Sequence, residues 1–491
     1  MRRRHKTIAI VGSAIVLLVG MLAAVAVRFI DVERYRPEVE AAITQATGLD
    51  CSLGTLSLRL WPFLSLRIEQ PALSRSGRPI LKAERITLSA HLLPLLNRRL
   101  ELRAITITRL TGTIRRDRRG NLNLLPPREP KPQQPLALPL ARLRIAEIVL
   151  DDAALRYEDA ASGFTAAAEG MDLALGPLLL VDQGKRLMTS GRDFFAASWE
   201  GNLKATTLFL NTMPLDHPTL RFASTGKSLA LQPVAAAVYG GKLKGSLTVR
   251  GLGENPQLAA TGTINGLDLA RLAAAVNHRG RVSGRLHASI TLTTDGAKRQ
   301  AMLHRLNGTV AMHGTDLTIE NIDLDTILTQ YAKSQEIGLL DLGSIFIVGP
   351  FGPLLSKAFD LSGAALGVGR GKSRITMLVS DWTIRNGMAC AADVALATPK
   401  HRLAFTGRLD LPAGRFLDFR VGILDPRGCA TFTQRVNGSF QEPQIEKASL
   451  LAGTLVAPLV SFFRKGMTAL GGEQPACTPF YRGRVPHPAT P

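Results

Sequence analysis

Apolar and polar residues alternate with a period of two over much of this chain. In the segments 56–60, 64–68 and 86–90 every second residue is Leu, Ile or Ala, and the residues between them are Ser, Thr or Arg. Successive side chains of a strand point to opposite faces, so the pattern predicts strands with one apolar and one polar face. Within 100–107 the alternation shifts register at Ala104, which indicates a bulge or a strand end.

The strand pattern resumes after residue 140 and continues through most of the chain. It recurs in the segments 143–157, 201–210, 241–253, 258–269, 284–296 and 306–319. Helical patterns are fewer and begin at Leu267, Leu324 and Lys447. The 45 glycines and 28 prolines, with only 5% aromatic residues, favour many short elements joined by turns. The chain is therefore predicted to be mainly β, with few short helices.

One apolar segment precedes the first strands. Residues 8–27 contain no charged side chain and are long enough to cross a hydrocarbon core of about 30 Å as a helix. Arg2, Arg3, Arg4 and Lys6 precede the segment, which predicts a cytoplasmic N-terminus and an exported remainder. A cleaved signal peptide is the alternative, because Ala24-Val25-Ala26 has the form of a cleavage site. The length of the segment favours a transmembrane anchor.

A short helix is predicted directly after this anchor, over residues 37–47. Pro37 suits the first helical position, and Gly48 suits the position that ends a helix. One face carries apolar residues at helical spacing, namely Val39, Ala42, Ile43 and Ala46. A helix of this length is unstable alone in water, so we expect it to pack against the strands that follow.

These patterns divide the chain into five predicted regions. Residues 1–30 form a cytoplasmic basic tip and transmembrane anchor, and residues 31–125 form a helix with a β-sheet. Residues 126–139 contain six prolines and are predicted to form a semi-rigid linker. Residues 140–476 form a large β-rich region, and residues 477–491 form a C-terminal tail.

The predicted sheet poses a physical problem, because its apolar face is long and the chain has few helices to cover it. One solution is a long, curved antiparallel sheet that forms an open hydrophobic groove, which is suited to acyl chains. The residues we expect to line such a groove are the apolar positions of the first strands: Leu56, Leu58, Leu60, Leu64, Leu66 and Ile68. Each could equally be an ordinary core residue.

The formal net charge of +21 raises the question of an acidic partner. Eight arginines lie between Arg98 and Arg119, but no aromatic residue is interleaved with them for base stacking. We therefore expect these arginines to form a solvated outer face. Attraction to anionic lipid headgroups is the second alternative, and we expect no nucleic-acid partner.

Four cysteines, Cys51, Cys390, Cys429 and Cys477, would lie in an oxidising compartment if the chain is exported by a bacterium. Their spacing matches no zinc site. One structural disulfide with two buried thiols is the simplest expectation. Three connectivities remain open from spacing alone, and Cys429 with Cys477 is the candidate pair that we name.

Catalytic motifs are not evident in the sequence. Residues 367–373 (GVGRGKS) approach a phosphate loop, but Leu366 stands where that motif requires glycine. Asp323 and Asp325 lack the glycine and the distal glutamate of a calcium loop. No HExxH or GxSxG motif occurs. We predict a non-enzymatic protein without a metal or another cofactor.

Several segments resemble AsmA-like proteins of Gram-negative bacteria. The N-terminal ones are 30–48 (IDVERYRPEVEAAITQATG), 54–68 (GTLSLRLWPFLSLRI) and 94–124. The later ones are 239–251 (YGGKLKGSLTVRG), 316–328 (DLTIENIDLDTIL), 392–411 and 477–488 (CTPFYRGRVPHP). The similarity lies in the running pattern rather than in a catalytic signature.

The resemblance implies a single-pass bacterial inner-membrane protein whose bulk lies in the periplasm. It also implies a relationship to bridge-like lipid-transfer proteins, with phospholipid or another acyl-chain lipid as the partner and a role in outer-membrane assembly and integrity. The leading hypothesis is passive lipid binding or transfer along the β-groove. The alternative is a non-enzymatic assembly factor that binds outer-membrane proteins or assembly components through exposed sheet edges.

Overall fold

The computed structural model describes most of the chain in two compact units. The described residues are 32–59, 63–91, 94, 97–124, 142–182, 185–186, 197–251, 255–275, 282–321, 323–326, 328–329, 371–440, 442–446 and 477–488. The units are Met1–Ala236 and Ala237–Pro491, and we describe each by itself. The boundary falls inside the predicted 140–476 region.

Helices are few and short, as the sequence predicts. They are the 3-10 helix η1 (Val32–Tyr35) and the α-helices α2 (Arg36–Thr47), α5 (Leu269–Ala275) and α6 (Arg299–His304), and residues 324–326 and 328–329 are also helical. In the part of the chain that the structure describes, no helix is long and apolar enough to cross a membrane. The predicted anchor 8–27, the segment 126–139 and the helix expected from Lys447 lie outside that part.

Helix α2 confirms the predicted short helix, with a corrected start. It begins at Arg36 rather than Pro37, because the η1 turn ends at Tyr35 and its helical backbone continues directly into Arg36, which leaves Pro37 in the first turn, where proline is tolerated. Its end at Gly48 is as predicted, with a left-handed φ of 67°. Val39 packs against the buried cluster that contains Leu56, so the helix contacts the first strands through this residue.

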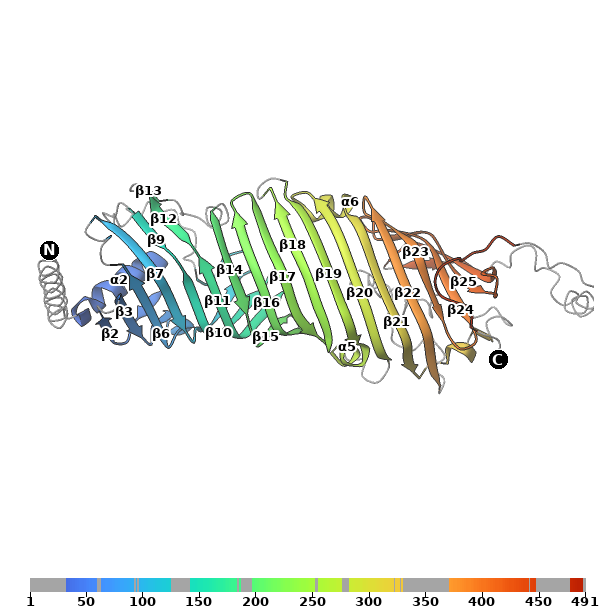
Figure 1. Ribbon diagram of the computed structural model, residues 1–491, viewed down its shortest axis with the longest axis horizontal. Coiled ribbons are helices and arrows are strands. Elements are labelled where there is room, and N and C mark those ends of the chain that lie inside the picture. Colours follow the sequence, from blue (N-terminus) through green and yellow to red (C-terminus); the bar gives the residue numbers. More distant parts are fainter. Residues whose placement is uncertain are drawn as a thin grey trace, which may run out of the picture. The chain divides into compact units, whose positions relative to one another are not determined.

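The first unit consists mainly of strands, which vary in length from 2 to 13 residues (Figure 1). They are β1 (Asp50–Ser52), β2 (Leu56–Arg59), β3 (Leu64–Glu69), β4 (Ala72–Arg75), β5 (Arg78–Lys82), β6 (Arg85–Ala90), β7 (Arg99–Thr108), β8 (Thr111–Arg116), β9 (Arg142–Ile145), β10 (Ile148–Asp159), β11 (Thr165–Gly176), β12 (Leu178–Asp182), β13 (Lys185–Arg186), β14 (Ser198–Lys204), β15 (Thr207–Leu210) and β16 (Met213–Thr225). Strand β17 (Ser228–Val238) contains the boundary between the units.

The predicted all-antiparallel pairing needs a correction in this unit. Strand β10 runs parallel to β7 and to β8, and β9 runs parallel to β7. A parallel pair needs a long connection, and the 25 residues between Arg116 and Arg142 supply one. The segment 126–139 therefore joins neighbouring strands of one unit.

The second unit contains an antiparallel meander in which each strand pairs with the next. Its strands are β18 (Gly241–Arg250), β19 (Gln257–Asp268), β20 (Val282–Asp295), β21 (Asn307–Glu320), β22 (Lys372–Arg385), β23 (Met388–Ala397), β24 (Arg402–Asp410), β25 (Arg415–Leu424), β26 (Ala430–Ser439) and β27 (Pro443–Ile445). Figure 1 shows β18 to β22 as long neighbouring strands. The chain is mainly β, as predicted.

The largest core lies on one face of this meander, toward its C-terminal strands. Trp382, Phe416 and Phe419 are almost fully buried, and Phe405 and Phe432 belong to the same cluster. Leu324 and Leu328 of the short helical segment also join it. Aromatic packing therefore stabilises the end of the unit formed by β22 to β26.

Candidate functional site

Apolar side chains form continuous rows across the strands of the first unit. One row is defined by directly paired residues from β2 to β16: Leu56, Ile68, Ile86, Ile107, Leu150, Leu173, Leu203 and Leu220. All eight are branched aliphatic residues. Leu56, Ile68 and Leu150 are buried, and the other five are half-buried.

A second and a third row run beside the first on the same face. The second contains Leu58, Leu66, Leu88, Ile105, Ile148, Leu175, Gly201 and Phe222, and the third contains Leu64, Ala90, Leu102, Ile145 and Leu178. The opposite face between the first two rows carries Ser57, Arg67, Thr87, Thr106, Val149, Ala174, Asn202 and Arg221. The sheet of this unit is thus apolar on one face and largely polar on the other.

The second unit has the same two-sided character, and the exposure of its apolar face changes along the meander. One row passes from Ile290 through Val310 to Trp382. Ile290 is 38% exposed, whereas Trp382 is 1% exposed. On the opposite face, the row from Ser246 to Thr261, Thr291, Thr309 and Thr383 consists only of hydroxyl residues. The apolar face is therefore partly open at β20 and closed at β22.

Five of the six predicted groove residues lie in the three rows of the first unit. Leu56 and Ile68 share one row, Leu58 and Leu66 share another, and Leu64 lies in the third. Leu60 lies outside the described residues. Leu56 and Ile68 are the most buried of the set, with 8% and 7% exposure, because Val32 and Val39 pack over them.

Sequence reasoning missed the far ends of these rows, such as Leu203 and Leu220. The alternation around each residue predicts a strand face, but only the pairing of distant strands shows that the faces are continuous. The parallel pairing of Ile107 with Leu150 is the step that no local signal indicates.

A line of backbone irregularities crosses the first unit at mid-strand. Non-glycine residues with positive φ stand there at Gln70 (49°), Arg109 (49°), Asp152 (55°) and His217 (48°). Backbone hydrogen bonds join neighbouring interruptions, for example from the N–H of Gln70 to the carbonyl of Glu84 and from that of Arg109 to the carbonyl of Asp151. We call this series of four residues the bulge line. It divides the strands into two halves and changes which face of the sheet the following side chains occupy.

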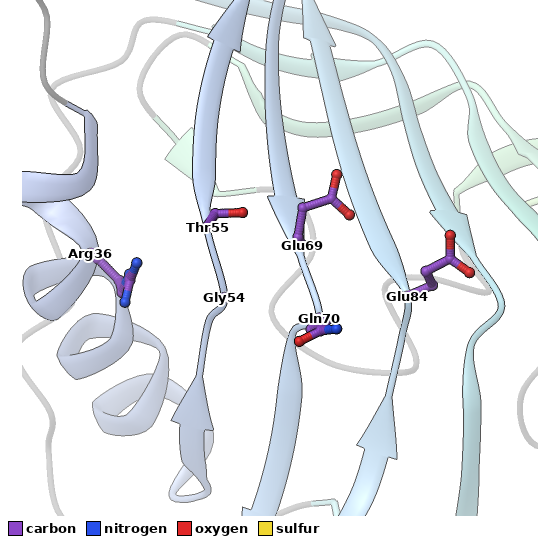
Figure 2. A pocket seen from close by; sticks show the side chains of 6 residues that line it. All are labelled: Arg36, Gly54, Thr55, Glu69, Gln70 and Glu84. Carbon is purple, nitrogen blue, oxygen red and sulfur yellow. The ribbon is translucent and has the colours of Figure 1, made fainter.

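A polar pocket of about 730 Å³ lies on the bulge line beside α2 (Figure 2). It is lined by Arg36, Gly54, Thr55, Glu69, Gln70 and Glu84. Figure 2 shows Arg36 on α2, Glu69 at the end of β3 and Glu84 between β5 and β6. The Glu69 carboxylate pairs with Arg85 at 3.0 Å, and the Glu84 carboxylate pairs with Arg109 at 2.7 Å. Its polar lining does not suit an acyl chain, and its carboxylates are already paired.

The N-terminal edge of the first unit is covered by side chains of η1 and α2. The N–H of Leu56 donates to Glu33 at 2.6 Å, and the N–H of Leu53 donates to Glu40 at 2.7 Å. The N–H of Cys51 donates to the hydroxyl of Thr44 at 3.2 Å. These backbone donors are therefore not available for pairing with a strand of another protein.

The C-terminal segment, residues 477–488, packs on the meander of the second unit. A disulfide joins Cys429 to Cys477, with the Cα atoms 6.2 Å apart. Tyr481 and Val485 are buried in an apolar cluster with residues of β22 to β25. Cys51 and Cys390 are free thiols. The segment thus covers part of the sheet and is fixed there covalently.

Asp393 holds this segment through polar contacts. It accepts hydrogen bonds from the Tyr481 hydroxyl at 2.5 Å and from Arg484 Nε at 3.0 Å. Burial alone would raise the pKa of Asp393, but the hydrogen bonds from Tyr481 and Arg484 outweigh burial and lower it. Burial and the bond to Asp393 raise the pKa of the Tyr481 hydroxyl.

The lowered pKa of Asp393 predicts that acid weakens the non-covalent contacts of the C-terminal segment, which stays attached through its disulfide. A carboxyl group whose pKa is lower in the folded state contributes stability above its ordinary pKa of 3.8, and this contribution is lost as the pH falls below that value. Hydrogen exchange of residues 477–488, corrected for the intrinsic effect of pH, should be slow at pH 6 and should become progressively faster as the pH falls below 3.8. Asp393→Asn should give faster exchange already at pH 6, with a smaller dependence on pH. An unchanged pH response in that variant would contradict this role of Asp393.

The motifs that approach catalytic signatures have structural roles where the structure describes them. Ser373 lies in β22, where its hydroxyl accepts the N–H of Leu324 at 2.8 Å. Asp323 accepts the N–H of Thr326 at the start of the helical segment. Asp325 accepts a hydrogen bond from Thr398 and contacts His401 Nδ1 at 2.9 Å. Among the described residues, no cluster of three metal-ligating side chains occurs.

Among the comparisons with known proteins, the comparison with protein-family models gives a match. The model of the AsmA family matches residues 1–206 and 194–374, so the two matched regions overlap and together extend from the N-terminus well into the second unit. No curated protein and no solved structure matches the chain.

Proposed function

The chain belongs to the AsmA family, and from this premise we propose that it is a membrane-anchored protein that binds phospholipid acyl chains on its apolar rows and passes them along passively. Family membership suggests a membrane-associated protein of lipid transport or assembly. We further propose that residues 8–27 anchor it in a bacterial inner membrane, with the N-terminus in the cytoplasm and the two units in the periplasm. Its role there would support outer-membrane assembly and integrity.

The observation that carries the proposal is the continuity of the apolar rows. The first row passes through eight paired residues without a polar interruption, and five of the eight keep part of their surface exposed. At about 4.8 Å between strands, eight paired strands extend over roughly 34 Å, which exceeds the length of one acyl chain. A lipid could therefore move from strand to strand without leaving apolar contact, while its headgroup stays in water.

Photocrosslinking tests this proposal on the two faces of one strand. A crosslinking amino acid at Leu66, in the second row, should capture phospholipid that mass spectrometry detects in the membrane-extracted protein. The same amino acid at Arg67, on the polar face of the same strand, is the matched control and should capture at least tenfold less. Equal capture at the two positions would reject the proposal.

The alternative of an assembly factor acting through exposed sheet edges is less well supported at the N-terminal edge. Glu33, Glu40 and Thr44 already accept the backbone N–H groups of that edge. A polypeptide crosslinked at Leu53 in place of lipid at Leu66 would favour this alternative.

A further inference from the structure

A basic surface lies at one end of the strands in the first unit. Strand β2 ends at Arg59, and the next strand begins at Leu64. Leu64 pairs with Ala90, the last residue of β6, and Arg99 at the start of β7 pairs with Arg142 at the start of β9. These pairings bring the ends of β2, β6, β7 and β9 to the same edge, which we name the basic end. Its described charged residues are Arg59, Arg98, Arg99, Glu101, Arg103, Arg142, Arg144 and Asp182.

Positive charge at the basic end is largely uncompensated. Arg142 pairs with Asp182 at 3.7 Å. In the part of the chain that the structure describes, no ion pair joins Arg59, Arg98 or Arg99 to a carboxylate, and all three are exposed. Six arginines thus face two carboxylates, which favours a partner with a dense negative charge.

The opposite end of the same strands provides an internal comparison. There Arg115 pairs with Glu158 at 2.9 Å, and Arg116 pairs with Asp159 at 3.3 Å. Asp117 also lies in this loop, where it accepts the N–H of Arg119. Arg109, Arg115 and Arg116 thus form ion pairs with carboxylates, whereas Arg98 and Arg99 form none with the described residues, a difference that the sequence alone does not show.

An exposed aromatic ring accompanies the uncompensated arginines. Phe63 is 39% exposed, although it lies beside the first strands. The guanidinium carbon of Arg103 stands 4.2 Å from the centroid of its ring, and the ring of His91 lies edge-on at 6.3 Å. An exposed apolar ring beside an arginine is typical of surfaces that enter the headgroup region of a bilayer.

The path of the chain directs this end toward the proposed membrane anchor. Thr44 accepts the N–H of Cys51 in β1, and Glu33 accepts the N–H of Leu56 in β2. The residues nearest the N-terminus therefore lie beside the end of β2 that leads to Arg59. Only residues 28–31 separate Val32 from the apolar segment 8–27. Four extended residues reach at most about 14 Å. If residues 8–27 lie in a bilayer, the basic end lies near its surface.

We propose that the basic end binds the surface of a bilayer containing anionic phospholipids, with Arg59, Arg98 and Arg99 on the phosphates and Phe63 at the acyl boundary. This proposal rests on the membrane attachment in the proposed function. It adds a second, charge-dependent contact that fixes the orientation of the first unit against the bilayer. The apolar rows would then begin beside the headgroups instead of at a variable distance from them.

Hydrogen exchange of the full-length protein in lipid nanodiscs tests the proposal. Nanodiscs of phosphatidylcholine alone are compared with nanodiscs that also contain phosphatidylglycerol. Peptides covering 56–68 and 97–103 should exchange at least about fivefold more slowly with the anionic lipid, and 0.5 M salt should remove the difference. Peptides covering 113–123 at the opposite end should not change. Equal exchange in the two lipids would overturn the proposal.

A pair of charge-reversal variants supplies the matched control. Arg98→Glu with Arg99→Glu should abolish the effect of phosphatidylglycerol, whereas Arg118→Glu with Arg119→Glu, at the opposite end, should preserve it. Unchanged exchange in the strands of the second unit verifies that each variant is folded. An equal response of the two double variants, or stronger protection of 97–103 by a DNA duplex than by anionic lipid, would overturn the proposal. Lipid capture at Leu66 is measured on the same variants, so loss of docking and loss of lipid binding are separate results.

Discussion

Replacing Trp382 with alanine is expected to lower the free energy of unfolding of the second unit by about 3 to 5 kcal/mol. The indole is 1% exposed and stacks on Phe419, with ring centroids 6.4 Å apart and an interplanar angle of 5°. Its Nε1 donates to the hydroxyl of the fully buried Ser380 at 2.9 Å. The substitution therefore removes a large buried surface and leaves a buried hydroxyl with one partner fewer. Urea denaturation, followed by hydrogen exchange in β22 to β25, measures the loss.

The control for this prediction is Ile290→Ala, two strands away in the same row. Ile290 is 38% exposed, so its truncation should cost no more than about 1 kcal/mol. A difference between the two variants would show that the apolar face is a packed core at β22 and a partly open surface at β20. Similar losses would contradict that reading of the row and would weaken the case for a lipid-accessible face in this unit.

Replacing Cys429 and Cys477 together by serine is expected to destabilise the second unit by about 4 kcal/mol. The bond closes a loop with a sequence separation of 48 residues, and loop-closure entropy in the unfolded chain accounts for this magnitude. The loss should also release Tyr481 and Val485 from their cluster, because the C-terminal segment would be held only by non-covalent contacts.

Thermal unfolding with and without reductant measures the contribution of the disulfide. Reductant should lower the melting temperature of the natural chain to that of the double serine variant and should leave the variant unchanged. The matched control replaces Cys51 and Cys390, which are free thiols, and its melting should retain the full response to reductant. A natural chain that does not respond to reductant would refute the prediction.

The strands of this protein could be predicted because each carries its own signal. In the segment 64–68 the alternation of Leu and Ile with Ser and Arg is complete, and β3 covers it. The register shift predicted at Ala104 corresponds to the irregularity beside it, where Ser89 pairs with Ala104 and Ala90 pairs with Leu102. Local sterics and one-sided burial determine these features, so a single sequence contains them.

The pairing of distant strands and the polar contacts could not be predicted in the same way. The parallel pairing of β10 with β7 depends on the crossover after β8, whose prolines indicate only that it is neither strand nor helix. The contact of Asp393 with Tyr481 joins residues 88 positions apart, and no periodic pattern connects them. Likewise, the sequence places Arg99 and Arg116 in one basic stretch, although the fold sends them to opposite ends of the strands.

The nearest-neighbour pairing of β18 to β27 makes the length of the apolar face an adjustable property. The backbone of each strand pairs with the strands before and after it in the chain, so adding or removing one hairpin would preserve the pairing register of the others. One hairpin adds two strands and so changes the length of the apolar face, measured across the strands, by about 10 Å. Duplication or loss of hairpins would thus change the distance over which the proposed lipid transfer extends, without redesign of the remaining strands.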